Sequence, residues 1–316
     1  MTDTAPPENI SSRLVERLAN PVHVAPVVDA AAQWFFQDIV VRVKRPAAHA
    51  ETLVLLNRIR GALGTALMRS ASPAAKNGQP CPYDPPCTLD VFYRTQLETA
   101  PGFNLPRPFV LQCDLARRRI DVRLRVFGFA TDWTMALRDA LVASLAHDVV
   151  FLGRDEGVDV RGTKAGFEVE GSHIETVHGL TLADPPPRIC LTIKTALDNA
   201  GTSLVDTPAS FIARLNRRIE GLARWQDMAL QADWGALRQA AEALTFDTDG
   251  LEQDTVHRGS RRQETAFENP SVFGDLVFTG PAVAVGAVWP FVVLGEITHA
   301  GRGATAGLGR YSLDEA

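Results

Sequence analysis

The stretch FVLQCDLARRRIDVRLRVF, residues 109–127, contains two β-prone segments around a polar centre, 115–119. This pattern predicts a hairpin of two strands, 109–114 and 120–127. In the second strand apolar residues alternate with arginines, so one face of the strand is apolar and the other is charged.

The residues on either side of this hairpin complete an α+β unit. A strand at 38–45 and a long helical pattern at 47–68 precede it. A helix at 134–146 and a short strand at 149–152 follow it. The order strand, helix, strand, strand, helix, strand is that of the ferredoxin-like, or RRM-like, βαββαβ unit.

The same order of elements recurs in the second half, without a visible repeat of the sequence itself. The expected elements are a strand at 188–196, helices at 208–228 and 234–244, an extended basic segment at 255–264, a strand at 272–279, a helix at 283–297 and a strand at 309–313. We therefore predict an α+β protein with two tandem ferredoxin-like domains. Their expected limits are a flexible N-terminus over 1–20, in which a short helix is possible at 11–19, a first domain over 21–165 and a second over 180–316.

The composition fits a two-domain globular protein of 316 residues. The net charge of −5 is unlike that of a typical nucleic-acid-binding domain, which is basic. Only four of the 32 basic residues are lysines, however, which leaves 28 arginines. A GC-rich genome explains this bias, and so does recognition of phosphate by the planar guanidinium group. Composition leaves both explanations open.

Nothing in the sequence predicts a membrane span, a secretory signal or a cofactor site. No apolar run reaches the ~18 residues of a spanning helix, and the first residues lack a basic segment followed by an apolar one. Cys81, Cys87, Cys113 and Cys190 lack the tight spacing of zinc ligands, which favours reduced thiols over a metal site. The simplest compartment is the cytoplasm.

Three stretches have compositions that stand out from the rest. They are HAGRGATAGLGRY at 299–311, VHRGSRRQE at 256–264, and LTIKTA at 191–196 followed by SFIARLNRR at 210–218. The glycines of the first allow positive φ and the close approach of backbone N–H groups to an anion. That run is neither a Walker A loop nor a dinucleotide fingerprint. Phosphate contact and a tight connection between a helix and the last strand both remain possible for it.

The order and spacing of these stretches resemble the CRISPR-associated RAMP-type endoribonucleases, which cut precursor guide RNA. RGALG at 60–64 and CPYDPPC at 81–87 are similar to one branch of that family. The resemblance covers most of residues 55–313, and the glycine run is its most specific part. It implies CRISPR repeat RNA as the partner, with other CRISPR-associated proteins as further candidates. The RNA-binding residues that we expect are Arg258, Arg261, Arg262, His299, Gly301, Arg302, Gly303, Gly307, Gly309 and Arg310.

The family's reaction needs a base for the 2′-hydroxyl and an acid for the leaving 5′-oxygen, and histidine suits both roles. The family usually places this histidine on or just beyond the first helix of the first domain. The segment 70–87 after that helix has no histidine, so the candidate is His49, in the first turn. Two functions stay open: a metal-independent endoribonuclease that leaves a 2′,3′-cyclic phosphate and a 5′-hydroxyl, or a catalytically inactive RNA-binding subunit.

Overall fold

The computed structural model describes residues 10–44, 52–94, 98–100, 103–149, 154–155, 158–159, 166–198, 205–259 and 266–314. The chain forms two compact units. The first comprises residues 1–23, 35–177 and 221–229, and the second comprises residues 24–34, 178–220 and 230–316. Each unit is built around one antiparallel sheet.

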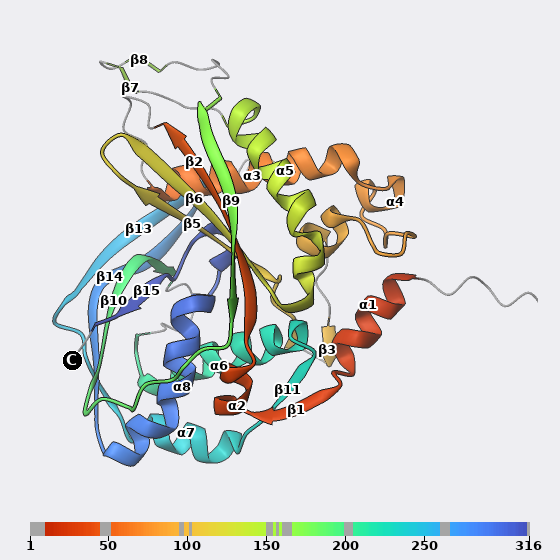
Figure 1. Ribbon diagram of the computed structural model, residues 1–316. Helices are drawn as coiled ribbons and strands as arrows, with labels where there is room; N and C mark the ends of the chain where they lie inside the picture. The colour runs from red at the N-terminus through yellow and green to blue at the C-terminus, as the bar shows by residue number, and fades with distance from the viewer. Residues whose placement is uncertain are drawn as a thin grey trace, which may run out of the picture. The chain divides into compact units, whose positions relative to one another are not determined.

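The first unit has a four-stranded sheet in the order β5-β6-β2-β9. Its strands are β2 (Phe35–Lys44), β5 (Phe109–Leu115), β6 (Arg119–Phe127) and β9 (Val169–His178), and its helices are α3 (Thr52–Ser70) and α5 (Thr134–His147). In chain order the elements alternate as β2-α3-β5-β6-α5-β9 (Figure 1). The last strand lies beside the first, which is the strand order of the ferredoxin-like fold.

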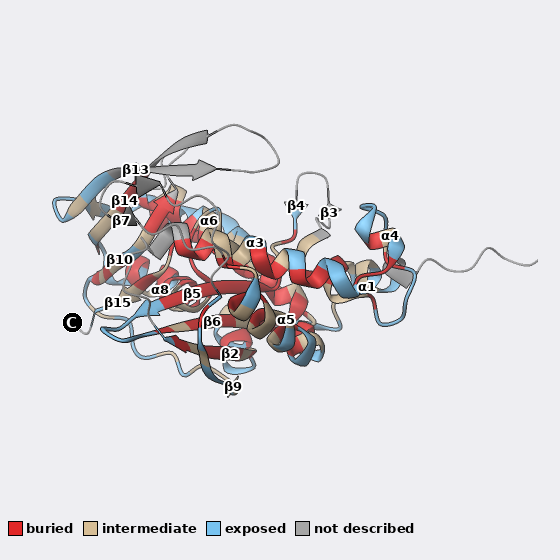
Figure 2. Cartoon of the chain, turned by 90° about the horizontal axis from the view of Figure 1, so that it is seen from above, coloured by how far each residue is buried: buried red, intermediate tan, exposed pale blue. Residues whose placement is uncertain are grey.

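The hairpin predicted at 109–127 is confirmed, and its apolar alternation explains the packing of the sheet. β2 and β6 pair with Val41 opposite Val122 and Ile39 opposite Leu124. These side chains are buried, as are Leu63 of α3 and Leu141 of α5. Buried residues run along β5, β6 and β2 in Figure 2. The apolar face of the sheet is thus the one that the two helices cover.

The fourth strand of this sheet is β9 and not the segment expected at 149–152. The N–H of Val149 donates to the Ser144 carbonyl at 3.1 Å, so this buried residue still belongs to the end of α5. The rest of that segment, 150–152, lies outside the described residues. β9 has polar residues on both faces and lacks the alternation that identifies a half-buried strand.

Smaller elements complete the first unit. They are α1 (Ile10–Ala19), α4 (Pro73–Lys76), the π-helical turn η1 (Asp90–Arg94), β3 (Glu98–Ala100), β4 (Phe103–Asn104), the 3₁₀ turn η2 (Gly128–Trp133), β7 (Arg154–Asp155) and β8 (Val158–Asp159). Helix α1 corresponds to the short helix that the sequence suggested at 11–19. Leu18 of this helix is fully buried, and Arg17 forms an ion pair with Asp227 at 3.1 Å.

The second unit repeats the same strand order. Its sheet runs β12-β14-β10-β15, and β13 also pairs with β14. The strands are β10 (Ile189–Asp198), β12 (Thr245–Asp247), β13 (Leu251–Gly259), β14 (Ala266–Thr279) and β15 (Tyr311–Leu313), and the larger helices are α6 (Pro208–Trp225), α7 (Trp234–Glu242) and α8 (Ala282–Thr298). The short elements β1 (His23–Pro26), α2 (Val27–Ala32) and β11 (Met228–Gln231) lie where the chain passes from one unit to the other.

The prediction of an α+β fold with two tandem ferredoxin-like units is confirmed by these two strand orders. The chain leaves β10, forms α6, returns through β14 and crosses back through α8 to β15. Helix α8 is apolar around most of its circumference, and ten of its residues are buried. No helix among the described residues is long and apolar enough to cross a membrane.

Candidate nucleic-acid interface

The glycine-rich loop joins the end of α8 to β15. Gly301, Gly303, Gly307 and Gly309 have φ angles of 74°, 82°, 80° and 69°. All four therefore occupy the left-handed region, which side chains strongly disfavour. A short 3₁₀ turn, η3 (Ala304–Ala306), lies between the two glycine pairs. The backbone conformation alone accounts for every glycine in the run.

Hydrogen bonds divide this loop into a closed part and an open part. The N–H groups of residues 306–310 donate to oxygens within the unit; that of Gly309, for example, donates to the Ala196 carbonyl at 3.0 Å. None of the hydrogen bonds found among the described residues uses the N–H groups of residues 301–305. Arg302 is exposed in the middle of this open part. Ala304 is buried, so residues 301–303 and 305 are the ones that can present free donors and one cation to an anion.

Three of the expected RNA-binding residues are buried and stabilise the conformation of the loop. His299 is fully buried, and its Nδ1 lies 3.2 Å from the Leu308 carbonyl. Gly307 and Gly309 are also buried. A Cβ atom at Gly309 would lie 1.8 Å from the Ala300 carbonyl oxygen. In this structure the three residues hold the loop closed, and their contact with RNA stays a prediction.

A buried arginine holds the start of the loop. Arg218 of α6 donates from Nε to the Thr298 carbonyl at 2.6 Å, where α8 ends. Burial lowers the pKa of Arg218 to about 10. A cation at the C-terminal end of a helix interacts favourably with the helix dipole. The paired arginines at 217–218 were noted in the sequence, but only the structure shows that one of them supports the loop.

The other expected site residues fall mostly outside what the structure describes. Arg258 lies on β13, opposite Phe267 of β14. Arg261, Arg262 and His49 lie outside the described residues. In the chain, His49 falls between β2 and α3. Arg310 is half-buried, and its carbonyl accepts hydrogen bonds from the N–H groups of Lys194 and Thr195.

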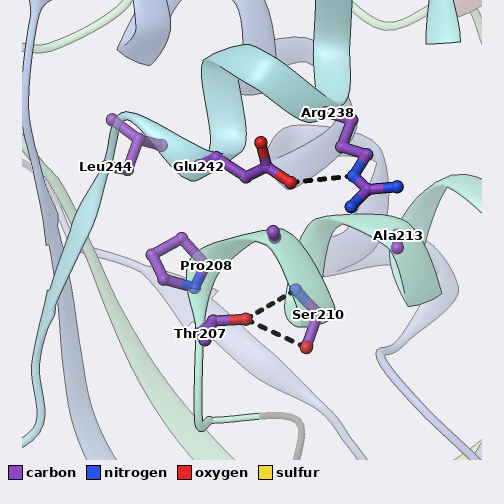
Figure 3. A pocket seen from close by; sticks show the side chains of 8 residues that line it. Thr207, Pro208, Ser210, Ala213, Arg238, Glu242 and Leu244 are labelled. Carbon is purple, nitrogen blue, oxygen red and sulfur yellow. Dashed lines mark hydrogen bonds and ion pairs between the residues drawn. The ribbon is translucent and has the colours of Figure 1, made fainter. Parts of the chain in front are cut away.

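One cavity of about 540 Å³ lies in the second unit, at the start of α6 (Figure 3). Its polar side chains bond to one another. Thr207 Oγ1 accepts from the Ser210 N–H at 3.1 Å, and Arg238 pairs with Glu242 at 2.8 Å. Because these polar groups bond to one another, they offer few donors or acceptors to a ligand. The described residues contain no group of three or more side chains suited to a metal ion, and their four cysteines are free thiols.

Comparison with known proteins places this loop inside a region that matches a known family. Residues 191–311 match the family described as CRISPR-associated endoribonuclease Cas6. The match begins in β10 and ends at Tyr311, so it includes the whole glycine-rich loop. Residues 191–311 of the chain are thus similar to Cas6 endoribonucleases. The resemblance inferred from the three stretches is thereby confirmed.

Solved Cas6 structures share the fold of the chain. A Cas6 product complex has a TM-score of 0.52 at 12% sequence identity, and the match covers 89% of this chain and 100% of the other. A Cas6 of Thermus thermophilus has a TM-score of 0.51 at 12% identity, covering 89% and 98% of the two chains. A comparison with curated proteins gave no match. At such identities the structural likeness shows a shared fold.

Proposed function

We propose that this protein is a Cas6-type endoribonuclease that cuts CRISPR repeat RNA into mature guide RNAs. The observation that carries this proposal is the family match over 191–311, with the glycine-rich loop inside it. The open part of that loop, residues 301–305, suits a phosphate group of the RNA backbone. Arg258, Arg261 and Arg262 remain proposed RNA contacts. The cytoplasm is the compartment that this function requires, because the repeat RNA is made there.

The proposed reaction uses the RNA's own 2′-hydroxyl as the nucleophile. His49 takes the 2′-hydroxyl proton, and the 2′-oxygen attacks the adjacent phosphorus. The bond to the 5′-oxygen breaks, and that oxygen receives a proton from an acid. The products are a 2′,3′-cyclic phosphate and a 5′-hydroxyl. The proton steps need a group with a pKa near neutral, which histidine supplies.

Cleavage of labelled repeat RNA in EDTA tests this proposal. We expect the wild-type chain to cut at one position and to leave a 5′ end that a kinase can label directly. His49→Ala should reduce the cleavage rate by about 10²-fold or more, because proton transfer contributes that much, and should keep RNA affinity. His147→Ala is the matched control, since His147 is exposed at the end of α5.

Each outcome of this experiment separates the two functions. A wild-type chain that binds repeat RNA tightly without cutting it is the inactive RNA-binding subunit, in which other CRISPR-associated proteins are the expected partners. Equal cleavage by the wild type and His49→Ala would mean that the protein is an endoribonuclease but that His49 takes no part in its mechanism. Cleavage that EDTA abolishes contradicts the metal-independent reaction.

A further inference from the structure

Two arginines of the first unit, Arg60 and Arg107, lie beside the same tyrosine. Arg60 lies on α3, and Arg107 lies in the segment before β5. They share Tyr93 as a neighbour: Arg60 Cζ lies 5.7 Å from the Tyr93 ring centroid, and Arg107 Nη2 donates to the Tyr93 carbonyl at 2.8 Å. Neither arginine forms an ion pair in the part of the chain that the structure describes.

The backbone around these arginines is held firmly. The Tyr93 hydroxyl donates to the Arg60 carbonyl at 2.7 Å. The Tyr93 ring packs against Gly64, where a Cβ atom would lie 2.8 Å from the ring. This contact explains the second glycine of RGALG. On the other side, Trp225 Nε1 donates to the Pro106 carbonyl at 3.1 Å, next to Arg107. Both side chains therefore start from fixed positions.

Without a ligand, Arg60 and Arg107 reduce the stability of the folded protein. The Nε atoms of Arg60 and Arg107 are both buried without a hydrogen-bond partner. Burial lowers the pKa of Arg107, and the nearby charge of Arg60 lowers it further. Tyr93 offers no compensating charge, because burial raises the pKa of its phenol and keeps it neutral. Unpaired buried donors and neighbouring like charges both destabilise a fold.

A bound anion would remove both costs at once. We propose that Arg60 and Arg107 form a second binding site for the RNA strand, which takes one phosphodiester group. A guanidinium group presents parallel N–H donors that match two phosphate oxygens, so two such groups can hold one phosphate firmly. The site rests on the proposed function, since it assumes that RNA is the ligand. It assigns a role to the RGALG stretch that the glycine-rich loop does not explain.

Salt titrations of repeat-RNA binding test the site. The variants are Arg60→Gln and Arg107→Gln, with Arg118→Gln as the matched control because Arg118 is exposed in the turn between β5 and β6. Each site variant should lower the slope of log K against log salt by about 0.7 if its phosphate contact is to a single strand. Arg118→Gln should leave both slope and affinity unchanged. If Arg107→Gln does not fold, the salt slope of Arg60→Gln decides the test.

Thermal melting separates an anion site from a structural pair. Removing Arg60 relieves the like-charge repulsion, so the melting temperature of Arg60→Gln should equal or exceed that of the wild type. Inorganic phosphate should raise the melting temperature of the wild type more than that of either variant, because it binds the folded state. Folded site variants with wild-type slope, affinity and phosphate response overturn the proposal. If the wild type fails to bind repeat RNA, the proposed function fails, and the phosphate response still reports on the site.

Discussion

At the scale of single residues, Asp38 shows how one buried acid organises the charged face of the first sheet. Its side chain is 3% exposed. Arg125 binds it through two hydrogen bonds of 2.8 and 2.9 Å, and Arg123 through one of 2.7 Å. Burial alone would raise the pKa of Asp38, but these hydrogen bonds and charges outweigh it and lower the pKa. The sequence pattern gives no sign of this, because a polar residue that alternates with apolar ones looks solvent-facing.

Replacing Asp38 should therefore destabilise the protein strongly. Asp38→Ala removes the buried carboxylate that Arg123 and Arg125 share. The loss of one partner of a buried pair costs about 3–5 kcal/mol. Urea unfolding at pH 7 measures this. Asp139→Ala is the control, since Asp139 is 67% exposed and its pair with Arg138 contributes little. A similar loss of stability in both variants would contradict this account.

The same carboxylate predicts a pH dependence. A lowered pKa in the folded state means that the stabilisation is fully present above the unfolded value near 3.8. It is lost as the pH falls below that value and through the folded pKa. We expect the stability difference between the wild type and Asp38→Ala to be constant from pH 7 to about 5 and to shrink below about 4. If the stability difference stays constant below pH 4, the ionisation of Asp38 is not its cause.

At the scale of elements, the sequence predicted those that have a buried face and missed those that do not. β2, β6 and α6 were expected because apolar residues recur along them with the period of a strand or a helix. β9 has polar residues on both faces, and α2 is only six residues long. The glycine-rich loop was expected as a unit. Its division into closed and open parts depends on bonds to Ala196 and Lys194, which are distant in the chain.

Alanine substitutions at two glycines should reveal that division. Gly303→Ala places a side chain in the left-handed region and should cost about 1–2 kcal/mol. Gly309→Ala carries the same strain and also brings Cβ to 1.8 Å from the Ala300 carbonyl oxygen, so the backbone must move. Urea unfolding should therefore show a clearly larger loss of stability for Gly309→Ala. Equal losses of stability would mean that the backbone moves away from the Ala300 carbonyl without a further cost.

At the scale of the whole molecule, the net charge of −5 limits how the chain can bind RNA. A general electrostatic attraction would require a basic protein. Here Asp38, Asp121 and Glu175 neutralise arginines of the first sheet. The RNA contacts that we propose are therefore a few local groups: the open part of the glycine-rich loop and the Arg60–Arg107 pair.

Binding of RNA that lacks the repeat sequence should consequently be weak. Non-specific complexes have dissociation constants of about 10⁻⁴–10⁻⁶ M at physiological salt, and an acidic chain belongs at the weak end, near 10⁻⁴ M. Fluorescence anisotropy with an unrelated single strand, beside labelled repeat RNA, measures both affinities under one condition. Raising the salt should weaken both complexes, because each depends on phosphate contacts. A micromolar or tighter complex with the unrelated strand would show that the acidic surface does not limit binding, and that specificity comes from the cleavage step instead.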